Sequence, residues 1–288
     1  MRKLLALTLA LSLLLCPASA QVALPGMGPL PFQYVSVGGG CSQATTFLAR
    51  TTVTGSLATN FTTLICGMVT DGTWALMDVF YVFATDTAAD AELNLMSTSY
   101  GLTQTGTVTF TANQGFTGNG STGYLNTGWS PSTNGVQYTQ NSASLGACSF
   151  TSATSSAYFL GARDVSGDSG FITASTGPVQ SYSINMTTGS PFSSGTSLGS
   201  DIITRTGASA IAAYINGSSV ASGAPTSVAP PSSLLYILAY DLAGTASNFY
   251  AGQLGYAFAG AGLTSTQVSN VYSRLHTFLS AVGAPTGC

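Results

Sequence analysis

Residues 201–221, with the sequence DIITRTGASAIAAYINGSSVA, decide the fold that we expect for this chain. Two runs rich in β-branched residues, 201–206 and 211–216, are separated by a short turn of small residues, which is typical of antiparallel strands. Asn216-Gly217 then stands between 212–215 and 218–221, where an Asn-Gly pair favours a two-residue hairpin turn. This stretch therefore predicts consecutive antiparallel strands, as in a β-sandwich or barrel.

The same pattern extends in both directions over residues 107–262. Short runs of β-branched and aromatic residues alternate with turns of Gly, Ser, Asn and Thr. Apart from the stretch above, they cover 107–112, 123–128, 157–162, 180–186, 234–240 and 253–259. No long helical pattern interrupts them, so a parallel sheet with crossover helices is not expected. The fold class that we predict is mainly β, an antiparallel jelly-roll β-sandwich.

Helical patterns flank this β region. Apolar residues between Leu57 and Met68 fall on one helical face, a second buried segment starts at Trp74, and residues 90–96 fit a short helix. At the other end, residues 264–267 (TSTQ) match a capping box. Apolar residues from 268 to 282 then fall on one helical face, and Gly283 ends the pattern. We expect a small helical region before the sandwich and an amphipathic helix after it.

The first twenty residues have the pattern of a signal peptide. Met1-Arg2-Lys3 is followed by an apolar run over 4–15, too short to span a bilayer, and then by Ala18-Ser19-Ala20. Small residues at 18 and 20 predict cleavage before Gln21. The alternative is a lipoprotein anchored at Cys16, which the bulky Leu15 disfavours. We expect a secreted protein, extracellular or periplasmic, without a membrane span in the mature chain.

These patterns divide the chain into four parts. Residues 1–20 are the signal peptide, and residues 21–44 form a flexible leader rich in Gly and Pro. Residues 45–100 form a helical preface to the main domain. Residues 101–288 form the β-sandwich together with its C-terminal helix.

Four cysteines follow the predicted cleavage site, Cys41, Cys66, Cys148 and Cys288. An even number in an exported chain favours two disulfides. Three pairings are possible and the sequence does not choose between them; we favour Cys41–Cys66 with Cys148–Cys288. The chain has no CxxC spacing and a single histidine, His276, so a zinc site is not expected.

Charged residues make up only 5% of the chain. Beyond residue 20 the cations are Arg50, Arg163, Arg205 and Arg274, against nine acidic residues. So few cations can neutralise few phosphates, which argues against nucleic-acid binding and against an anionic membrane surface. With 45% hydrophobic and 10% aromatic residues, the composition still favours a packed core over disorder.

Two segments resemble the concanavalin A-like jelly-roll domains of the LamG type. Residues 116–128 (FTGNGSTGYLNTG) are similar to the opening motif of that fold. Residues 235–239 (LYILA), 249–254 (FYAGQL) and 263–272 (LTSTQVSNVY) resemble its closing segment. The resemblance implies a sandwich whose first and last strands lie side by side. Because such domains occur in lectins and glucanases, it also implies carbohydrate binding.

The arrangement over roughly residues 45–284 is also similar to virion-appendage proteins of phages and prophages that carry such a domain. Residues 74–100 and 110–118 carry this likeness. The predicted signal peptide departs from it, because a tail protein assembled in the cytoplasm needs no export. A structural or assembly protein akin to phage tail or virion appendages is therefore the alternative function.

The sequence shows no arrangement of residues that is typical of a catalytic site. A glycosidase needs two carboxylates that flank the scissile bond, and the laminarinase-like relatives place glutamates close together on one strand. This chain has one glutamate, Glu92, outside the β region, and its aspartates are scattered. His276 lies at the margin of the last helix, and no G-x-S-x-G elbow stands between a strand and a helix. We expect no enzymatic activity, and a glycoside hydrolase is the least favoured alternative.

Loop residues form the predicted ligand site, a shallow glycan site at the rim of the sandwich. Trp129 and Tyr138 follow turns and can stack on sugar rings, and Arg163 can donate several hydrogen bonds. Asp164 and Asp168 can accept from sugar hydroxyls or hold Ca²⁺, as a rim loop often does in LamG-type domains. The competing interpretations are that Trp129 is a core residue and that the aspartates form an ordinary hairpin turn.

These observations predict a secreted or cell-surface recognition module without catalytic activity. Its expected partner is a glycan or cell-surface polysaccharide, and no nucleic acid is expected. Ca²⁺ at Asp164 and Asp168 is the one cofactor considered.

The predicted export signal can be tested on the secreted protein. We expect a mature N-terminus at Gln21, because Ala18-Ser19-Ala20 provides the small residues that signal peptidase requires. Intact-mass analysis of the protein recovered outside the cytoplasm measures this directly. A species that begins at an acylated Cys16, or an uncleaved Met1, would contradict the prediction.

Overall fold

The computed structural model describes residues 40–175, 179–187, 189–193 and 197–288. The predicted signal peptide, Cys16 and most of the predicted leader lie outside the described residues. The chain divides into two units, Met1–Gly38 and Gly39–Cys288, and the description below concerns the second.

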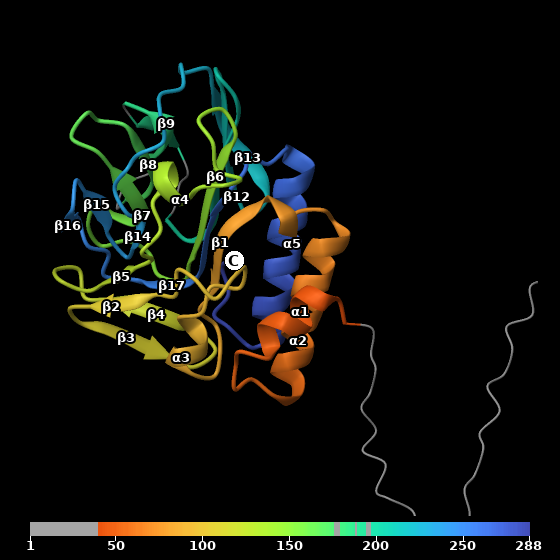
Figure 1. Ribbon diagram of the computed structural model, residues 1–288. Helices are drawn as coiled ribbons and strands as arrows, with labels where there is room; N and C mark the ends of the chain where they lie inside the picture. Colours follow the sequence, from red (N-terminus) through yellow and green to blue (C-terminus); the bar gives the residue numbers. More distant parts are fainter. Residues whose placement is uncertain (1–39, 176–178, 188, 194–196) are drawn as a thin grey trace, which may run out of the picture. The chain divides into compact units, whose positions relative to one another are not determined.

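Two β-sheets packed face to face form the body of this unit (Figure 1). The eight strands of sheet A are β1 (Met77–Val82), β3 (Val108–Thr111), β4 (Gly115–Gly118), β6 (Ala143–Ser149), β11 (Gly199–Gly207), β12 (Ala210–Ile215), β13 (Ser218–Gly223) and β17 (Gln253–Gly260). Their order is β13-β12-β11-β6-β17-β4-β3, and β1 also pairs with β17.

Sheet B is the second layer. Its nine strands are β2 (Thr103–Thr105), β5 (Tyr124–Asn126), β7 (Ala157–Arg163), β8 (Ser169–Ala174), β9 (Val179–Met186), β10 (Ser190–Ser193), β14 (Tyr236–Ile237), β15 (Tyr240–Leu242) and β16 (Thr245–Ser247). The order is β10-β9-β8-β7-β14-β5-β2, with β15 beside β7 and β16 beside β15. The pairing of β15 with β7 is parallel, and the other described pairs are antiparallel.

The predicted fold class, a mainly β sandwich with a C-terminal helix, is confirmed. The hairpin at Asn216-Gly217 joins β12 to β13, and both turn residues have positive φ, 49° and 74°, as a type I′ turn requires. The last strand, β17, pairs with β4, where the opening motif begins, and with the first strand, β1.

Helices cover one side of the sandwich (Figure 1). They are α1 (Ser42–Leu48), α2 (Gly55–Thr70) and α5 (Ser265–Ala281), and shorter turns are η1 (Trp74–Leu76), α3 (Ala88–Ala91) and α4 (Pro131–Asn134). The predicted capping box is present at Thr264 and Gln267, so the N-terminus of α5 satisfies two of its own amide groups.

The helical prediction for residues 45–100 is wrong in its second half, because residues 77–82 form strand β1 of sheet A. Side chains alternate along it. Val79 and Tyr81 point into the apolar layer between the sheets, whereas Phe80 and Val82 pack toward the helices. A run that is apolar on both faces has no period, and it cannot be told from a buried helix. The short helix that we expected over 90–96 is not formed there: α3 covers Ala88–Ala91, and residues 92–96 are turns and irregular chain.

Two apolar clusters lie on the two faces of sheet A. One fills the space between the sheets and includes Phe116 and Trp129. The other, between sheet A and helices α1, α2 and α5, includes Phe61, Phe258 and Phe278. Every residue of β6 is buried as a consequence. Sheet A is therefore the middle of three layers.

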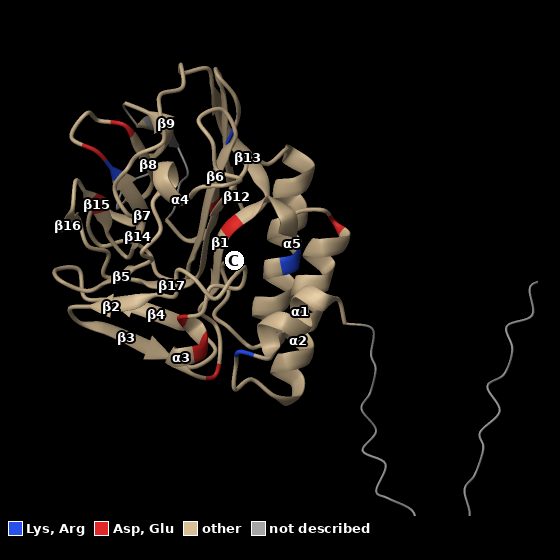
Figure 2. Ribbon diagram, viewed as in Figure 1, with Lys and Arg blue, Asp and Glu red and all other residues tan. Residues whose placement is uncertain are grey.

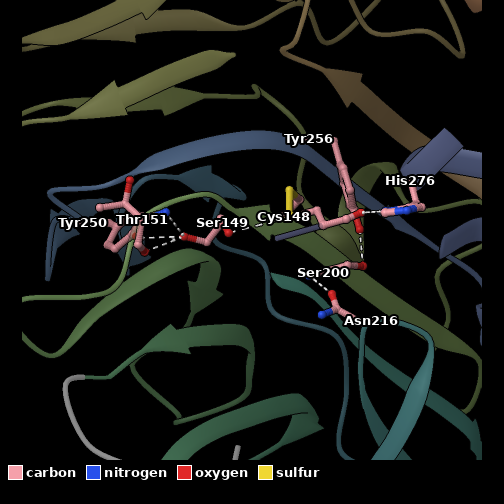
Figure 3. Close-up of a disulfide and its surroundings, with 9 residues drawn as sticks. Cys148, Ser149, Thr151, Ser200, Asn216, Tyr250, Tyr256 and His276 are labelled. Atoms are coloured by element: carbon pink, nitrogen blue, oxygen red, sulfur yellow. Dashed lines mark hydrogen bonds between the residues drawn. A yellow bond between two sulfur atoms is a disulfide. The ribbon is translucent and has the colours of Figure 1, made fainter. Parts of the chain in front are cut away.

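Both predicted disulfides, including the pairing that we favoured, are confirmed. Cys41–Cys66 ties the start of α1 to α2, and Cys148–Cys288 ties β6 to the end of the described chain. Figure 3 shows the second bridge beside the hydrogen-bonded Ser200 and Tyr256. His276 Nδ1 lies 2.6 Å from the backbone oxygen of Cys288, so the last residues are held to α5 as well as to β6.

Removing each disulfide separately tests how the two bridges divide the stabilisation. Chain entropy predicts about 3.5 kcal/mol for a loop of 25 residues and about 5 kcal/mol for a loop of 140. We therefore expect Cys148→Ser/Cys288→Ser to lower the melting temperature more than Cys41→Ser/Cys66→Ser. Calorimetry of the two double variants gives the order, and the reverse order would contradict this account.

One buried carboxyl group stands between the sheets. Asp201 of β11 is buried and accepts a hydrogen bond of 2.6 Å from the hydroxyl of Tyr182 on β9. Its second oxygen, Oδ2, has no hydrogen-bond partner among the described residues. Burial raises the pKa of Asp201 well above its ordinary value, although the Tyr182 hydrogen bond acts in the opposite direction. The carboxyl is therefore protonated in the folded protein at pH values where the unfolded chain ionises it.

This proton gives the stability a defined pH dependence. Because the folded state binds the proton and the unfolded state releases it above about pH 4, the contribution of Asp201 to stability falls as pH rises, by about 1.4 kcal/mol per unit until the folded group ionises. Asp201→Asn keeps the acceptor for Tyr182 and removes the titration. We expect urea unfolding between pH 5 and 8 to show a flatter profile for this variant, with Asp86→Asn as an exposed control. An unchanged slope would refute the assignment.

Candidate functional site

A surface hollow of about 620 Å³ lies at one end of sheet B. Three segments bound it: the β7–β8 loop, the segment that enters β14, and the turn between β15 and β16. The residues that line it are Asp164, Val165, Ser166, Ser232, Ser233, Leu234, Tyr236, Asp241, Ala243 and Gly244. Its volume falls in the range of small-ligand sites, about 300–1,000 Å³.

Strand β7 brings these segments together. β14 pairs with the middle of β7 (Tyr236 opposite Gly161), and β15 pairs with its end (Leu242 opposite Arg163). The chain reverses between β14 and β15 through Leu238, whose φ is 66°. Residues about 70 positions apart in sequence thereby meet beside one strand end.

Asp164 closes one wall of the hollow. Its two carboxylate oxygens accept hydrogen bonds from the backbone amides of Ser232 and Ser233, at 2.8 and 2.9 Å, and from both hydroxyls, at 3.1 and 2.8 Å. Burial alone would raise the pKa of Asp164, but these hydrogen bonds outweigh it and the pKa is lowered. Asp164 is therefore ionised, and it fixes the segment that leads into β14.

Asp241 is the second carboxyl group of the hollow. It is only 1% exposed and accepts from the backbone amides of Leu234, at 2.9 Å, and Gly244, at 2.6 Å. Burial raises its pKa, the charge of Asp164 adds to this, and the backbone amides oppose it. Asp241 therefore fixes the segment before β14 and the β15–β16 turn in one arrangement.

Apolar surface completes the hollow. Val165, at the tip of the β7–β8 loop, is 92% exposed, Leu234 is half-buried, and the buried Tyr236 borders the hollow. Tyr236 is one of the aromatic residues of sheet B outside the two apolar clusters, which we call the outer aromatic cluster. Their ring contacts form two groups, one of Tyr124, Tyr236 and Phe249 and one of Tyr158, Phe171 and Tyr240. Gly161 permits this packing, because a Cβ there would lie 2.6 Å from Phe171 Cβ.

Trp129 and Tyr138 do not belong to this site, so their predicted role is wrong. Trp129 is 0% exposed and packs edge-on against Tyr138, which is 2% exposed and donates its hydroxyl to Asn185. A ring without exposed surface offers no face to a sugar. The competing interpretation, that Trp129 is a core residue, describes the structure. Only its backbone approaches the site, where Trp129 O accepts from the amide of Leu235.

The rim loop that we predicted to bind ligand does border the hollow. Figure 2 shows its acidic residues beside β8 in an otherwise sparsely charged molecule. Asp164 lines the hollow, whereas Arg163 and Asp168 do not. The charge of Arg163 acts on Tyr158 of the outer aromatic cluster, whose pKa burial nevertheless raises. Asp168 accepts from the hydroxyl of Ser166 at 3.0 Å.

Asp164 and Asp168 do not fit the Ca²⁺ site that we considered. Four hydrogen bonds occupy the oxygens of Asp164, and Asp168 turns to Ser166 instead. Within the described ranges, no three His, Cys, Asp or Glu side chains gather as metal ligands. The loop is an Asp-rich hairpin turn, in which the amide of Asp164 donates to the backbone oxygen of Asp168.

No sequence pattern marked Ser232, Ser233 or Asp241 as site residues, and Tyr236 lies in the run 234–240 that we expected to form a strand. Tyr236 is buried, yet it lies outside both apolar clusters. No local pattern marks these residues, because their common position arises only when β14 and β15 pair with β7. The helices of the described part of the chain include none that is long and apolar enough to cross a membrane.

Comparison with known proteins finds similarity in structure only. No family model and no curated protein sequence matches the chain. The binding domain of botulinum neurotoxin serotype G is similar with a TM-score of 0.50 and 12% identity, over 68% of this chain and 50% of that one. A sialidase of Trypanosoma rangeli, solved with 2,3-difluorosialic acid, is similar with a TM-score of 0.50 and 13% identity, over 71% and 33%.

These likenesses show a shared fold. Identities of 12% and 13% are too low to carry ligands or residue roles from one protein to another. The chain spans half of the toxin domain and a third of the sialidase, so neither whole protein is a counterpart.

Proposed function

We propose that this protein is an exported, non-catalytic recognition module that binds carbohydrate at the hollow beside the end of β7. The observation that carries the proposal is the combination of surfaces in one site. Serine hydroxyls and carboxylates lie beside the exposed Val165 and the half-buried Leu234. A sugar ring presents hydroxyls at its edge and C–H groups on its faces, so it can use both kinds of surface at once.

The frame around the hollow also supports binding. The two carboxylates hold the three bounding segments in place before any ligand arrives, and a preorganised site loses less entropy on binding. The fold likeness is compatible with a recognition role, since the similar toxin fragment is a binding domain.

The absence of catalysis is part of the proposal. A glycosidase acid must reach the glycosidic oxygen, but Asp241 is almost fully buried and both its oxygens accept backbone amides. Asp164 is committed to Ser232 and Ser233 in the same way. Glu92 binds Gln104 at 2.7 Å and does not line the hollow. Each of these three carboxyl groups is engaged in hydrogen bonds within the protein.

Export is the second part of the proposal. Two disulfides in one chain are typical of an oxidising compartment, and they agree with the predicted signal peptide. An extracellular or periplasmic location would expose the hollow to cell-surface polysaccharide. The LamG-type resemblance and the alternative role as a phage-like assembly protein stay predictions, and a protein without glycan affinity that copurifies with virions would favour the latter.

Filling the hollow tests the proposed site. Ser166 is exposed on the β7–β8 loop and lines the hollow, so Ser166→Trp places an indole ring in the ligand volume without touching the core. We expect the glycan that binds best on an array to lose at least about tenfold in affinity, or about 1.4 kcal/mol. Titration calorimetry measures the loss, and the melting temperature should stay unchanged.

Ser219→Trp is the matched control, because Ser219 is an exposed serine on edge strand β13 of the other sheet. It should bind the glycan as the unmodified protein does. Equal affinity of both variants would place the ligand elsewhere, and an array without any binding would overturn the carbohydrate proposal.

A further inference from the structure

The charge of the hollow is one-sided. Asp164 and Asp241 both line it, and its described lining contains no Lys, Arg or His. The nearest cation in sequence, Arg163, lies outside the lining and acts on Tyr158. Negative charge in a concave site is focused by the low-dielectric walls, so an anionic ligand meets repulsion there.

The hydrogen-bonding groups of the hollow also favour one kind of ligand. The hydroxyl proton of Ser232 is directed at Asp164, that of Ser233 at Asp164 or the backbone oxygen of Arg163, and that of Ser166 at Asp168. A serine oxygen whose proton is committed offers a ligand only its lone pairs. The polar side chains that face the hollow are therefore mainly acceptors, and they match a ligand that donates.

From these two observations we infer that the hollow recognises neutral and amino sugars and rejects acidic sugars. A neutral sugar donates through its hydroxyls, and a protonated amino sugar adds an ammonium group with three donors and a positive charge. A uronic acid, a sialic acid or a sulfated sugar brings acceptors and negative charge into a site that already has both. This inference rests on the proposed function, since it specifies the sugar class that the same hollow takes.

A glycan array with matched sets tests the inference on the full secreted protein. Each set has one linkage in three forms: β-1,4-linked oligomers of glucose, of glucosamine and of glucuronic acid, and equivalent sets for other backbones. We expect binding within a set to be strongest for the amino form, weaker for the neutral form and at least about tenfold weaker again for the acidic form. Added salt should reduce these differences, because it screens exposed charges.

A cation added at the rim should reverse the order. Val165 lines the hollow and is 92% exposed, so Val165→Arg brings a positive charge to the site at little cost in stability. We expect this variant to weaken amino-sugar binding and to admit the acidic form. Val220→Arg, at an exposed position on edge strand β13, adds the same charge to the other sheet and should leave the order unchanged.

The outcomes separate the inference from the proposed function. Acidic glycans bound as well as their neutral counterparts, or an order that Val165→Arg and Val220→Arg change equally, would overturn the inference and leave carbohydrate binding standing. Binding of no glycan in any set would overturn both.

Discussion

The structure depends on the burial of sheet A on both of its faces. One face packs against sheet B and the other against α1, α2 and α5, so every residue of β6 is buried and β17 is nearly as enclosed. A polar side chain in such a sheet is costly unless it is hydrogen-bonded. The Ser200–Tyr256 and Asp201–Tyr182 hydrogen bonds reduce this cost, whereas Ser144 Oγ and Asp201 Oδ2 have no partner among the described residues. The Cys148–Cys288 bridge then fixes the chain beyond α5 to the centre of the same sheet.

The helices pack against sheet A and do not cover the outer face of sheet B. The candidate site lies on that side of the molecule. One face of the strands of sheet B packs in the core, and the other carries the outer aromatic cluster, which meets the hollow at Tyr236. Two carboxylates, Asp164 and Asp241, hold distant segments together by accepting backbone amides. Ionised Asp164 also gives the hollow negative charge. The ligand selection that we propose therefore rests on a group that also supports the hollow.

Local sequence patterns predicted the elements that depend only on neighbouring residues. Asn216-Gly217 marks a hairpin and residues 264–267 mark a helix start, and both are present because turns and caps depend on a few neighbouring residues. Strand β1 was missed because a segment buried on both faces has no hydrophobic period. Trp129 was misplaced because a residue after a turn can point inward as readily as outward. The hollow could not be predicted, since Asp164, Ser232 and Asp241 meet only through the pairing of β14 and β15 with β7.

The central claim is that ligand binds at this hollow on sheet B. The most direct test follows the amide chemical shifts of the isotopically labelled protein during titration with a neutral or amino-sugar oligomer. Each backbone amide reports changes in its own surroundings. The account predicts the largest shifts at residues 164–166, 232–236 and 243–244, with little change at Trp129 and in α5. Shifts confined to another surface, such as the edge strand β13, would contradict the account.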